Sequence, residues 1–385
     1  MRNKSRVIAV MMILTMWFSF ASCDDELVEE QDSTEIVEPI VDGNNDGTTV
    51  ADTTGGTNTE NRPIIENQTF NKTLIIDGHE NDSLIIRNCT FENMSDIALL
   101  IKTVDHVIIR DCIFRNLQSH AIFLQAGQSS DDILIEGNEI YNVSGIGIFA
   151  GEDHINTKCL GNIINEVGLV NIDGHTPHGI YLCGKNFMIE GNTISKCGSE
   201  DGKGVGISVR SYGTISKNKI YDGKASGISF SSDHSAFYGT LLIENNVIFD
   251  NFENAISLYM SNEDSPLGKV TVRFNTLLSG NKPVIYANTW KSMESELESF
   301  GNILIRTDGD INYVDVSTSN AFIESQNLVS SGDLGFADFT ERDFHLISGS
   351  KALNFAVGIL DFPQEDMEDK NRSSSDLDAG AYEAK

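Results

Sequence analysis

The chain has 385 residues, of which 40% are hydrophobic, 33 are glycine and only 6 are proline, enough for one large domain or two ordinary ones. It carries 27 Lys and Arg against 57 Asp and Glu, a formal net charge of −30. Such a surface repels phosphate backbones, which argues against a nucleic-acid partner. Gly and Asn turns interrupt nearly every apolar run, so a helical bundle is not expected.

The first 22 residues predict a secretory signal peptide. Three basic residues precede an apolar run at 7–20, which is too short for an ordinary membrane span. The run ends in the sequence FASC at 20–23, which resembles a bacterial lipobox. That resemblance implies cleavage before Cys23 and lipidation of its thiol; the alternative is an ordinary signal peptide followed by a chance cysteine.

The segment after Cys23 predicts the location of the protein. The acidic run DDELVEE at 24–30 resembles the surface-export signal of Bacteroidetes lipoproteins, which implies a lipid anchor in the outer membrane and exposure at the cell surface. In enterobacteria an Asp after the lipidated Cys implies inner-membrane retention instead, so the leaflet stays open. The lipid would be the chain's one membrane contact.

Residues 23–62 are an acidic, Thr/Gly/Asn-rich stretch with little that could form a core, and we interpret them as a tether. The sequence DGNNDG at 42–47 resembles a calcium loop but lacks the downstream Glu of an EF-hand, so we assign it to the tether. Without Cys23, five cysteines remain, and their odd number argues against a disulfide framework.

One pattern recurs over residues 63–330: a short alternating apolar run, a polar pair, an Asn or Cys marker, and two more apolar residues. The markers are Cys89, Cys112, Asn138, Asn162, Asn192, Asn218, Asn246, Asn275 and Asn302. A second strand-like motif lies between the markers, for example GIFA at 147–150 and GIYL at 179–182. Each repeat therefore holds at least two short period-2 strands and no helix.

This repeat length predicts a solenoid. It is too short for a propeller blade, and the leucine-rich-repeat consensus is absent. The pattern resembles the right-handed parallel β-helix proteins of the pectin-lyase-like superfamily. We therefore expect an all-β fold, a single-stranded right-handed parallel β-helix of roughly ten coils, with the marker residues stacked at one turn. Since this fold hosts lyases, hydrolases, epimerases and phage adhesins, it does not define an activity.

Residues 331–385 resemble the closing module of many secreted bacterial β-helix proteins. The resemblance rests on DFHL at 343–346, GSKALN at 349–354 and DLDAGAYE at 376–383. Lys351 stands where Pro is usual and Asn354 where Asp is usual. We expect this module to cap the open end of the solenoid, whose strand edges are otherwise exposed.

A polymer-binding groove is expected on the outward face of the second strand of each repeat, since inward positions fill the core. Aligning the coils places Phe123, Phe149 and Tyr181 on consecutive rungs of one outward column. Such aromatics could stack on sugar rings, which makes Phe123 and Phe149 candidate substrate-binding residues. The alternative is a buried aromatic stack beneath a loop.

The densest polar cluster is DGHTPHGIY at 173–181, and neighbouring coils add more polar residues. The candidate catalytic residues are His178, Tyr181, Arg210 and Lys203. The further candidate substrate-binding residues are Asp173, His175, Asp233 and His234.

These residue types suit β-elimination on a polyuronate, which needs a base for the C5 proton and a positive group against the carboxylate. His178 or Tyr181 would act as base or acid and Arg210 as the carboxylate clamp, with Lys203 in reserve. A hydrolase would need two carboxylates roughly 5–9.5 Å apart, for which Asp153, Asp173 and Asp233 are candidates. A zinc site lacks a third ligand, whereas Asp153 and Asp173 could hold Ca²⁺.

We therefore expect a surface-anchored, monomeric protein that acts on an extracellular polysaccharide, most plausibly as a lyase-like enzyme. A hydrolase or epimerase on the same fold is the near alternative. The alternative from another class is a non-catalytic glycan-binding or adhesin lipoprotein. An enzyme requires ionisable groups from neighbouring coils to converge on one point.

Overall fold

The computed structural model describes residues 62–384, except 171, 173–175, 233–238, 260–267, 289–295 and 317–321. The signal peptide, Cys23, almost all of the tether, Asp173, His175, Asp233 and His234 lie outside the described residues and stay predictions. Among the helices of the described part, none is long and apolar enough to cross a membrane.

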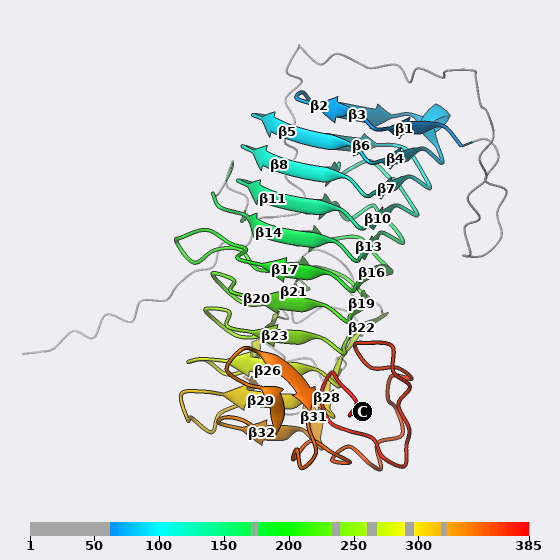
Figure 1. Cartoon of the computed structure of the whole chain (residues 1–385). Coiled ribbons are helices and arrows are strands. Elements are labelled where there is room, and N and C mark those ends of the chain that lie inside the picture. The colour runs from blue at the N-terminus through cyan, green and yellow to red at the C-terminus, as the bar shows by residue number, and fades with distance from the viewer. Residues whose placement is uncertain are drawn as a thin grey trace, which may run out of the picture.

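The described chain winds into a solenoid of short parallel strands that form three sheets along its axis (Figure 1). Sheet A contains β1 Ile64–Glu66, β4 Ile85–Arg87, β7 Ile108–Arg110, β10 Leu134–Glu136, β13 Lys158–Leu160, β16 Phe187–Glu190, β19 Gly213–Ser216, β22 Gly239–Glu244, β25 Gly268–Arg273, β28 Glu296–Phe300 and β31 Phe322–Ser325. Sheet B contains β2 Thr69–Phe70, β5 Thr90–Met94, β8 Ile113–Leu117, β11 Glu139–Val143, β14 Ile163–Val167, β17 Thr193–Ser195, β20 Lys219–Tyr221, β23 Val247–Phe249, β26 Thr276–Ser279, β29 Ile303–Arg306 and β32 Leu328–Ser330. Sheet C contains β3 Leu74–Asp77, β6 Leu99–Lys102, β9 Ile122–Leu124, β12 Ile148–Ala150, β15 Ile180–Leu182, β18 Ile207–Val209, β21 Ile228–Ser231, β24 Ile256–Tyr259, β27 Ile285–Asn288 and β30 Val314–Val316.

The strand order confirms the predicted coil. Each coil runs from sheet A through sheet B to sheet C, and every strand pairs in parallel with its counterpart one coil away. Sheets of eleven, eleven and ten strands agree with the expectation of roughly ten coils. The described residues also include one short 3-10 helix, His79–Asn81.

A two-residue turn between sheets A and B explains the polar pair in the repeat. Its first residue adopts a left-handed conformation, for example Asp111 at φ 53° and Gly137 at φ 62°. Gly, Asn and Asp tolerate this conformation best, so they recur there. The second residue of the turn is the marker.

The marker asparagines form a ladder of buried amides along the solenoid. Asn218 donates from Nδ2 to the carbonyl of Ile189, at 2.9 Å, and to Oδ1 of Asn246, at 2.9 Å. Its own Oδ1 accepts from the backbone N–H of Asn192, at 2.9 Å. Each amide thus satisfies backbone groups that the sharp turn leaves without a strand partner. The prediction of a stacked turn ladder is confirmed.

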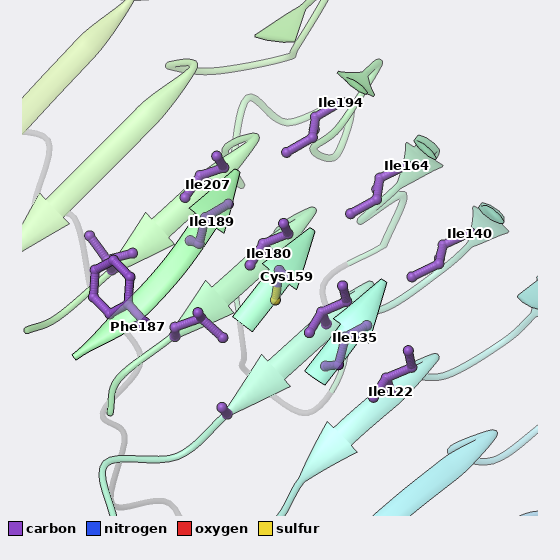
Figure 2. Packing of buried hydrophobic residues seen from close by; sticks show 14 of the residues in the cluster. Ile122, Ile135, Ile140, Cys159, Ile164, Ile180, Phe187, Ile189, Ile194 and Ile207 are labelled. Carbon is purple, nitrogen blue, oxygen red and sulfur yellow. The ribbon is translucent and has the colours of Figure 1, made fainter. Parts of the chain in front are cut away.

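The interior is a set of apolar columns, one from each sheet, shown in Figure 2. Cys159 pairs with Ile189 in sheet A, and Ile180 pairs with Ile207 in sheet C. All four are buried. The prediction that Ile180 and Ile207 face inward is confirmed, so the alternate residues of sheet C face outward.

The C-terminal module packs on the side of the solenoid. It contains an antiparallel pair, β33 Phe336–Asp338 and β34 Asp343–Leu346, and its apolar side chains cover the outer face of sheet B at Val247, Leu278 and Ile305. In Figure 1 it lies beside β26, β28 and β29.

The module thus lies beside the last coils, where sheet B presents apolar residues outward and offers a large apolar area to bury. It reaches the last coil at Gln326, whose Nε2 donates to the carbonyl of Val357 at 3.2 Å. In the described part of that end of the solenoid the side chains of Val314, Val316 and Phe322 stay partly exposed, and closure of the open end stays a prediction.

Its DLDAGAYE motif supplies the docking contacts. Gly380 donates its N–H to the carbonyl of Gly301, at 2.8 Å, with φ +90°. An added Cβ there would lie 2.6 Å from Cδ1 of Ile303, so only glycine fits. Arg372 reaches Oε1 of Glu383 at 2.6 Å and Oδ1 of Asn245 at 2.9 Å, which joins the module to the turn ladder's edge.

Replacing a central ladder residue is expected to destabilise the whole solenoid. Asn218→Ala leaves the Ile189 carbonyl and the Asn192 N–H buried without these partners, which should cost about 3–5 kcal/mol of unfolding free energy. Asn165→Ala is the matched control, because its half-buried amide makes one hydrogen bond, to Ser195 Oγ at 2.8 Å, and should cost under about 1 kcal/mol. Urea denaturation followed by circular dichroism measures both, and equal losses would contradict the ladder's role.

Candidate functional site

The outward column of sheet C has the predicted register. Phe123, Phe149 and Tyr181 pair directly on consecutive strands. Beyond Tyr181 the column continues with Ser208, Ser229, Ser257, Tyr286 and Asp315. Parallel pairing of in-register strands fixes this order, so no bulge shifts it.

The three aromatic residues do form a stack, and most of it is covered. The ring centroids of Phe123 and Phe149 lie 4.4 Å apart in a stacked pair, and Phe149 meets Tyr181 edge-on at 5.5 Å. Phe149 is 7% exposed and Phe123 is half-buried. Ile146 and Cys183 pack against the stack. This geometry favours the buried aromatic stack over an open sugar-binding wall at Phe149, and leaves Phe123 as its more accessible end.

Three of the four predicted catalytic residues converge. The guanidinium carbon of Arg210 lies 4.9 Å from the centroid of the Tyr181 ring, within cation–π range. The imidazole of His178 lies 4.9 Å from the same ring in an edge-on contact. Arg210 also donates from Nη1 to Ser208 Oγ, at 3.0 Å. Two adjacent rungs thus bring a cation, a phenol and an imidazole to one point, as the sequence alignment of the coils predicted.

These three groups are buried. Tyr181 and Arg210 are each 3% exposed and His178 is 6% exposed. A ligand can therefore reach them only when the covering segments open locally. Burial also strengthens the electrostatic effect of Arg210 on its neighbours, because the surroundings screen its charge less than water does.

His178 is held as a neutral hydrogen-bonding group. Its Nδ1 accepts from the backbone N–H of Val205, at 3.2 Å, which places the proton of the neutral ring on Nε2. Burial and then the positive charge of Arg210 lower the pKa of His178 to about 3. His120 occupies the equivalent turn position and accepts from the N–H of Ile146 at 2.8 Å. A turn-fixing role thus accounts for His178, and Nε2–H can serve as a donor but not as a base.

Lys203 does not join the cluster. Its Nζ pairs with Asp201 at 3.1 Å, and about half of its side chain is exposed. Its backbone carbonyl closes a local turn by accepting from Ser199. The alignment could not foresee this, because Lys203 lies in the turn before β18 rather than in a strand.

Metal-binding groups in the described residues lie away from this point. Asp153 accepts from the N–H of Gly127 at 2.9 Å, while Asp173 lies outside the described residues. His79, Asp82 and Asp105 could bring three ligand atoms within 4.8 Å of one another. However, Asp82 already caps the N–H of Asp105 at 2.8 Å, which is a structural role. The expectation of Ca²⁺ stays a prediction.

A second polar group on sheet C was not selected from the sequence. Tyr259 and Tyr286 lie on consecutive rungs with ring centroids 5.9 Å apart, and Glu253 lies in the turn before β24. Both tyrosines lie at outward positions of period-2 strands, and this period was the available signal in the sequence. Glu253 gave no such signal, because residues in turns do not follow the period-2 pattern of the strands.

Comparisons with known proteins give a family match and several similar solved structures. A family described as "Right handed beta helix region" matches residues 126–300. Among solved structures, pectate lyase Pel9A is 12% identical, with a TM-score of 0.47, over 81% of this chain and 82% of that chain. The Azotobacter vinelandii mannuronan C-5 epimerase AlgE6 A-module is also 12% identical, with a TM-score of 0.33, over 70% of this chain and 81% of that chain. A search of curated protein sequences finds no match.

The protein is a right-handed parallel β-helix, as its strand pairing and the family match together establish. The predicted parallel β-helix architecture is thereby confirmed. At the identities and scores above, the activities of the similar structures do not transfer to this chain.

The buried state of His178 should make the protein less stable in acid. Its folded pKa lies below the usual 6.5, so its contribution to stability is present above pH 6.5 and is lost as the pH falls toward 3. Between pH 7 and pH 4 the loss should reach about 3 kcal/mol. His178→Gln should flatten this part of the pH dependence in urea denaturation.

The matched control for that measurement is His79→Gln, since the side chain of His79 is 68% exposed. This variant should keep the acid dependence of the wild type. An unchanged acid dependence in His178→Gln would show that the imidazole is not buried in solution.

Proposed function

We propose that the protein is a carbohydrate-active β-helix protein that acts on an extracellular polysaccharide as a lyase-like enzyme. The observation that carries the proposal is the Arg210 guanidinium above the Tyr181 ring on adjacent rungs of sheet C. A positive charge beside a phenol is the pair that β-elimination on a uronate requires. The three sheets also form a long side surface that suits an extended polymer.

In this proposal Arg210 binds the carboxylate of a uronate and offsets the charge that develops at C5. To act as the base, the Tyr181 oxygen would first give its proton to solvent; as a phenolate beside the Arg210 cation it would then take the C5 proton. The C5–H bond and the C4–O bond to the leaving sugar break, a C4=C5 double bond forms, and the leaving oxygen takes its proton from the Tyr181 hydroxyl, which returns that side chain to the phenolate. The Nε2–H of His178 donates toward the reacting groups, in keeping with its neutral state.

The remaining candidates have supporting places in this proposal. Asp173, His175, Asp233 and His234 would contact the substrate from the turns beside sheet C, and Phe123 would pack on a sugar at the outer end of the aromatic stack. Lys203, whose charge is paired with Asp201, has no part in the reaction step of this proposal. Ca²⁺ would supply a second positive charge; EDTA would then lower the rate, and added Ca²⁺ would restore it.

Arg210→Ala is expected to lower turnover strongly. Removing the clamp leaves the uronate carboxylate unneutralised, and loss of one such contact typically costs about 10²–10³ in rate. Arg210→Lys should stay strongly impaired, because an ammonium keeps the charge but not the planar fork. The assay is the ultraviolet absorbance of the unsaturated product on polygalacturonate, alginate and other uronate polymers.

Arg115→Ala is the matched control, since Arg115 lies on sheet B and pairs with Glu92, at 2.7 Å from Nε. It should leave turnover unchanged. Circular dichroism and thermal melts verify that each variant folds. A wild-type protein that binds a uronate polymer without any unsaturated product would contradict the lyase proposal.

The burial of the cluster favours one alternative, a non-catalytic glycan-binding or adhesin protein. With Arg210, Tyr181 and His178 only 3–6% exposed, the cluster could instead stabilise the coil beneath a binding surface. Glycan binding that survives Arg210→Ala would support this alternative. A hydrolase has less support, because Asp153 is engaged by a backbone N–H and its proposed partners lie outside the described residues. An epimerase would use the same C5 proton transfer without forming the double bond.

We also propose that the protein is a monomer held at the outer membrane or cell surface by a lipid on Cys23. The lipobox-like sequence and the acidic run after it support this location. Cys23→Ser should move the protein from the detergent phase to the aqueous phase in a phase-partition experiment on cells of a Bacteroidetes host. Identical partition of both forms would favour an ordinary signal peptide.

A further inference from the structure

The second polar group on sheet C lies on the same face as Arg210. Arg210 directly follows β18, and Tyr259 is the last residue of β24, which lies two rungs from β18 in sheet C. Two rungs at about 4.8 Å each place its backbone about 10 Å from that of Arg210 along the solenoid. Tyr286 follows on the next rung. The two groups are thus close enough for one oligosaccharide to contact both.

The tyrosines form an aromatic ledge. Their rings meet edge-on, with centroids 5.9 Å apart and planes at 65°, and both residues are only half-buried. This exposure distinguishes them from Phe149 and Tyr181, which are covered. The accessible part of a half-buried aromatic ring presents an apolar face to a sugar, while the Tyr259 hydroxyl is engaged by Ser257.

A network of hydrogen bonds positions polar groups beside the ledge. Ser226 Oγ and Ser257 Oγ lie 2.8 Å apart, and Ser257 donates to Asn254 Oδ1 at 3.3 Å. Ser226 also contacts Glu253 Oε2 at 3.5 Å. The half-buried Glu253 carboxyl is therefore held by the turns before β21 and β24, next to the outward column that carries Ser257.

The charges around the ledge disfavour a uronate. Glu253 acts on Tyr259 through its charge, and Asp315 acts on Tyr286 in the same way. Lys282 is the one cation that acts on Glu253 in the described residues, so carboxylates outnumber cations there. Burial raises the pKa of Glu253, which lets this carboxyl donate a hydrogen bond at mildly acidic pH.

We propose that Glu253, Tyr259 and Tyr286 form a second subsite that binds a neutral, hydroxyl-rich sugar of the same glycan chain whose uronate lies at Arg210. The inference rests on the proposed function, because it takes Arg210 as the uronate contact. The substrate class is then a glycan that contains both uronate and neutral sugars, rather than a pure polyuronate. The two subsites set the direction in which the chain lies along sheet C.

The test measures binding by isothermal titration calorimetry with four probes. Two are a disaccharide and an octasaccharide in which galacturonate alternates with rhamnose, and two are oligogalacturonides of the same lengths. The wild type should bind the alternating octasaccharide about tenfold more tightly than its disaccharide. It should also prefer that octasaccharide to the all-uronate octasaccharide.

Tyr259→Ala and Tyr286→Ala should each weaken the affinity for the alternating octasaccharide about three- to tenfold, which is the range of one aromatic contact. Both should leave the affinity for the disaccharide unchanged. Glu253→Gln should raise the affinity for the all-uronate octasaccharide, since it removes a like charge. Tyr141→Ala is the matched control, because Tyr141 lies on sheet B, and it should change none of the affinities.

The outcomes separate the two proposals. Binding that Arg210→Ala weakens, but that is independent of chain length and of both tyrosines, overturns the second subsite and keeps the proposed function. Binding to none of the probes by folded wild-type protein overturns both. Loss of length dependence in both tyrosine variants, with retained disaccharide binding, supports the subsite.

Discussion

Every feature of this molecule depends on the register in which one coil sits on the next. The turn between sheets A and B fixes that register, because it always has two residues, the first left-handed and the second facing inward to the ladder. The amide of each ladder Asn bonds to the coils on both sides, so a one-residue slip would unpair several buried groups at once. The unequal repeat spacing must therefore be absorbed by the other two turns.

Those two turns flank sheet C, so the variation in turn length lies beside the strands that carry the candidate catalytic residues. The turns on either side of sheet C differ in length from rung to rung, while the strands of sheet C keep their register. Tyr259 and Tyr286 stay half-buried, whereas Tyr181 and Arg210 are almost fully covered. A rigid column of backbone positions with variable cover is a means of presenting different side chains to one elongated ligand.

The sequence was sufficient for the coil and for the outward columns, because period-2 strands and a fixed turn repeat on every rung. It could not give exposure, since the cover over Phe149 and Tyr181 comes from turns without a period. Glu253 was missed for the same reason. The face of sheet B on which the C-terminal module packs could be predicted in part from the sequence. The strand VIF at 247–249 is apolar throughout, whereas the strand EIY at 139–141 alternates between polar and apolar residues. A continuous apolar strand is expected when both faces are buried.

A protein with a net charge of −30 can still bind an anionic sugar if one cation acts locally. Charges more than about 10 Å away are largely screened at physiological salt, so most carboxylates of the solenoid contribute little at Arg210. A guanidinium with 3% exposure is screened far less and dominates the potential at its own rung. The balance reverses at Glu253, two rungs later, and at Asp315, four rungs later. In the proposed arrangement the sign of the local charge changes along one face, and a chain of mixed uronate and neutral sugars would fit that face in one direction.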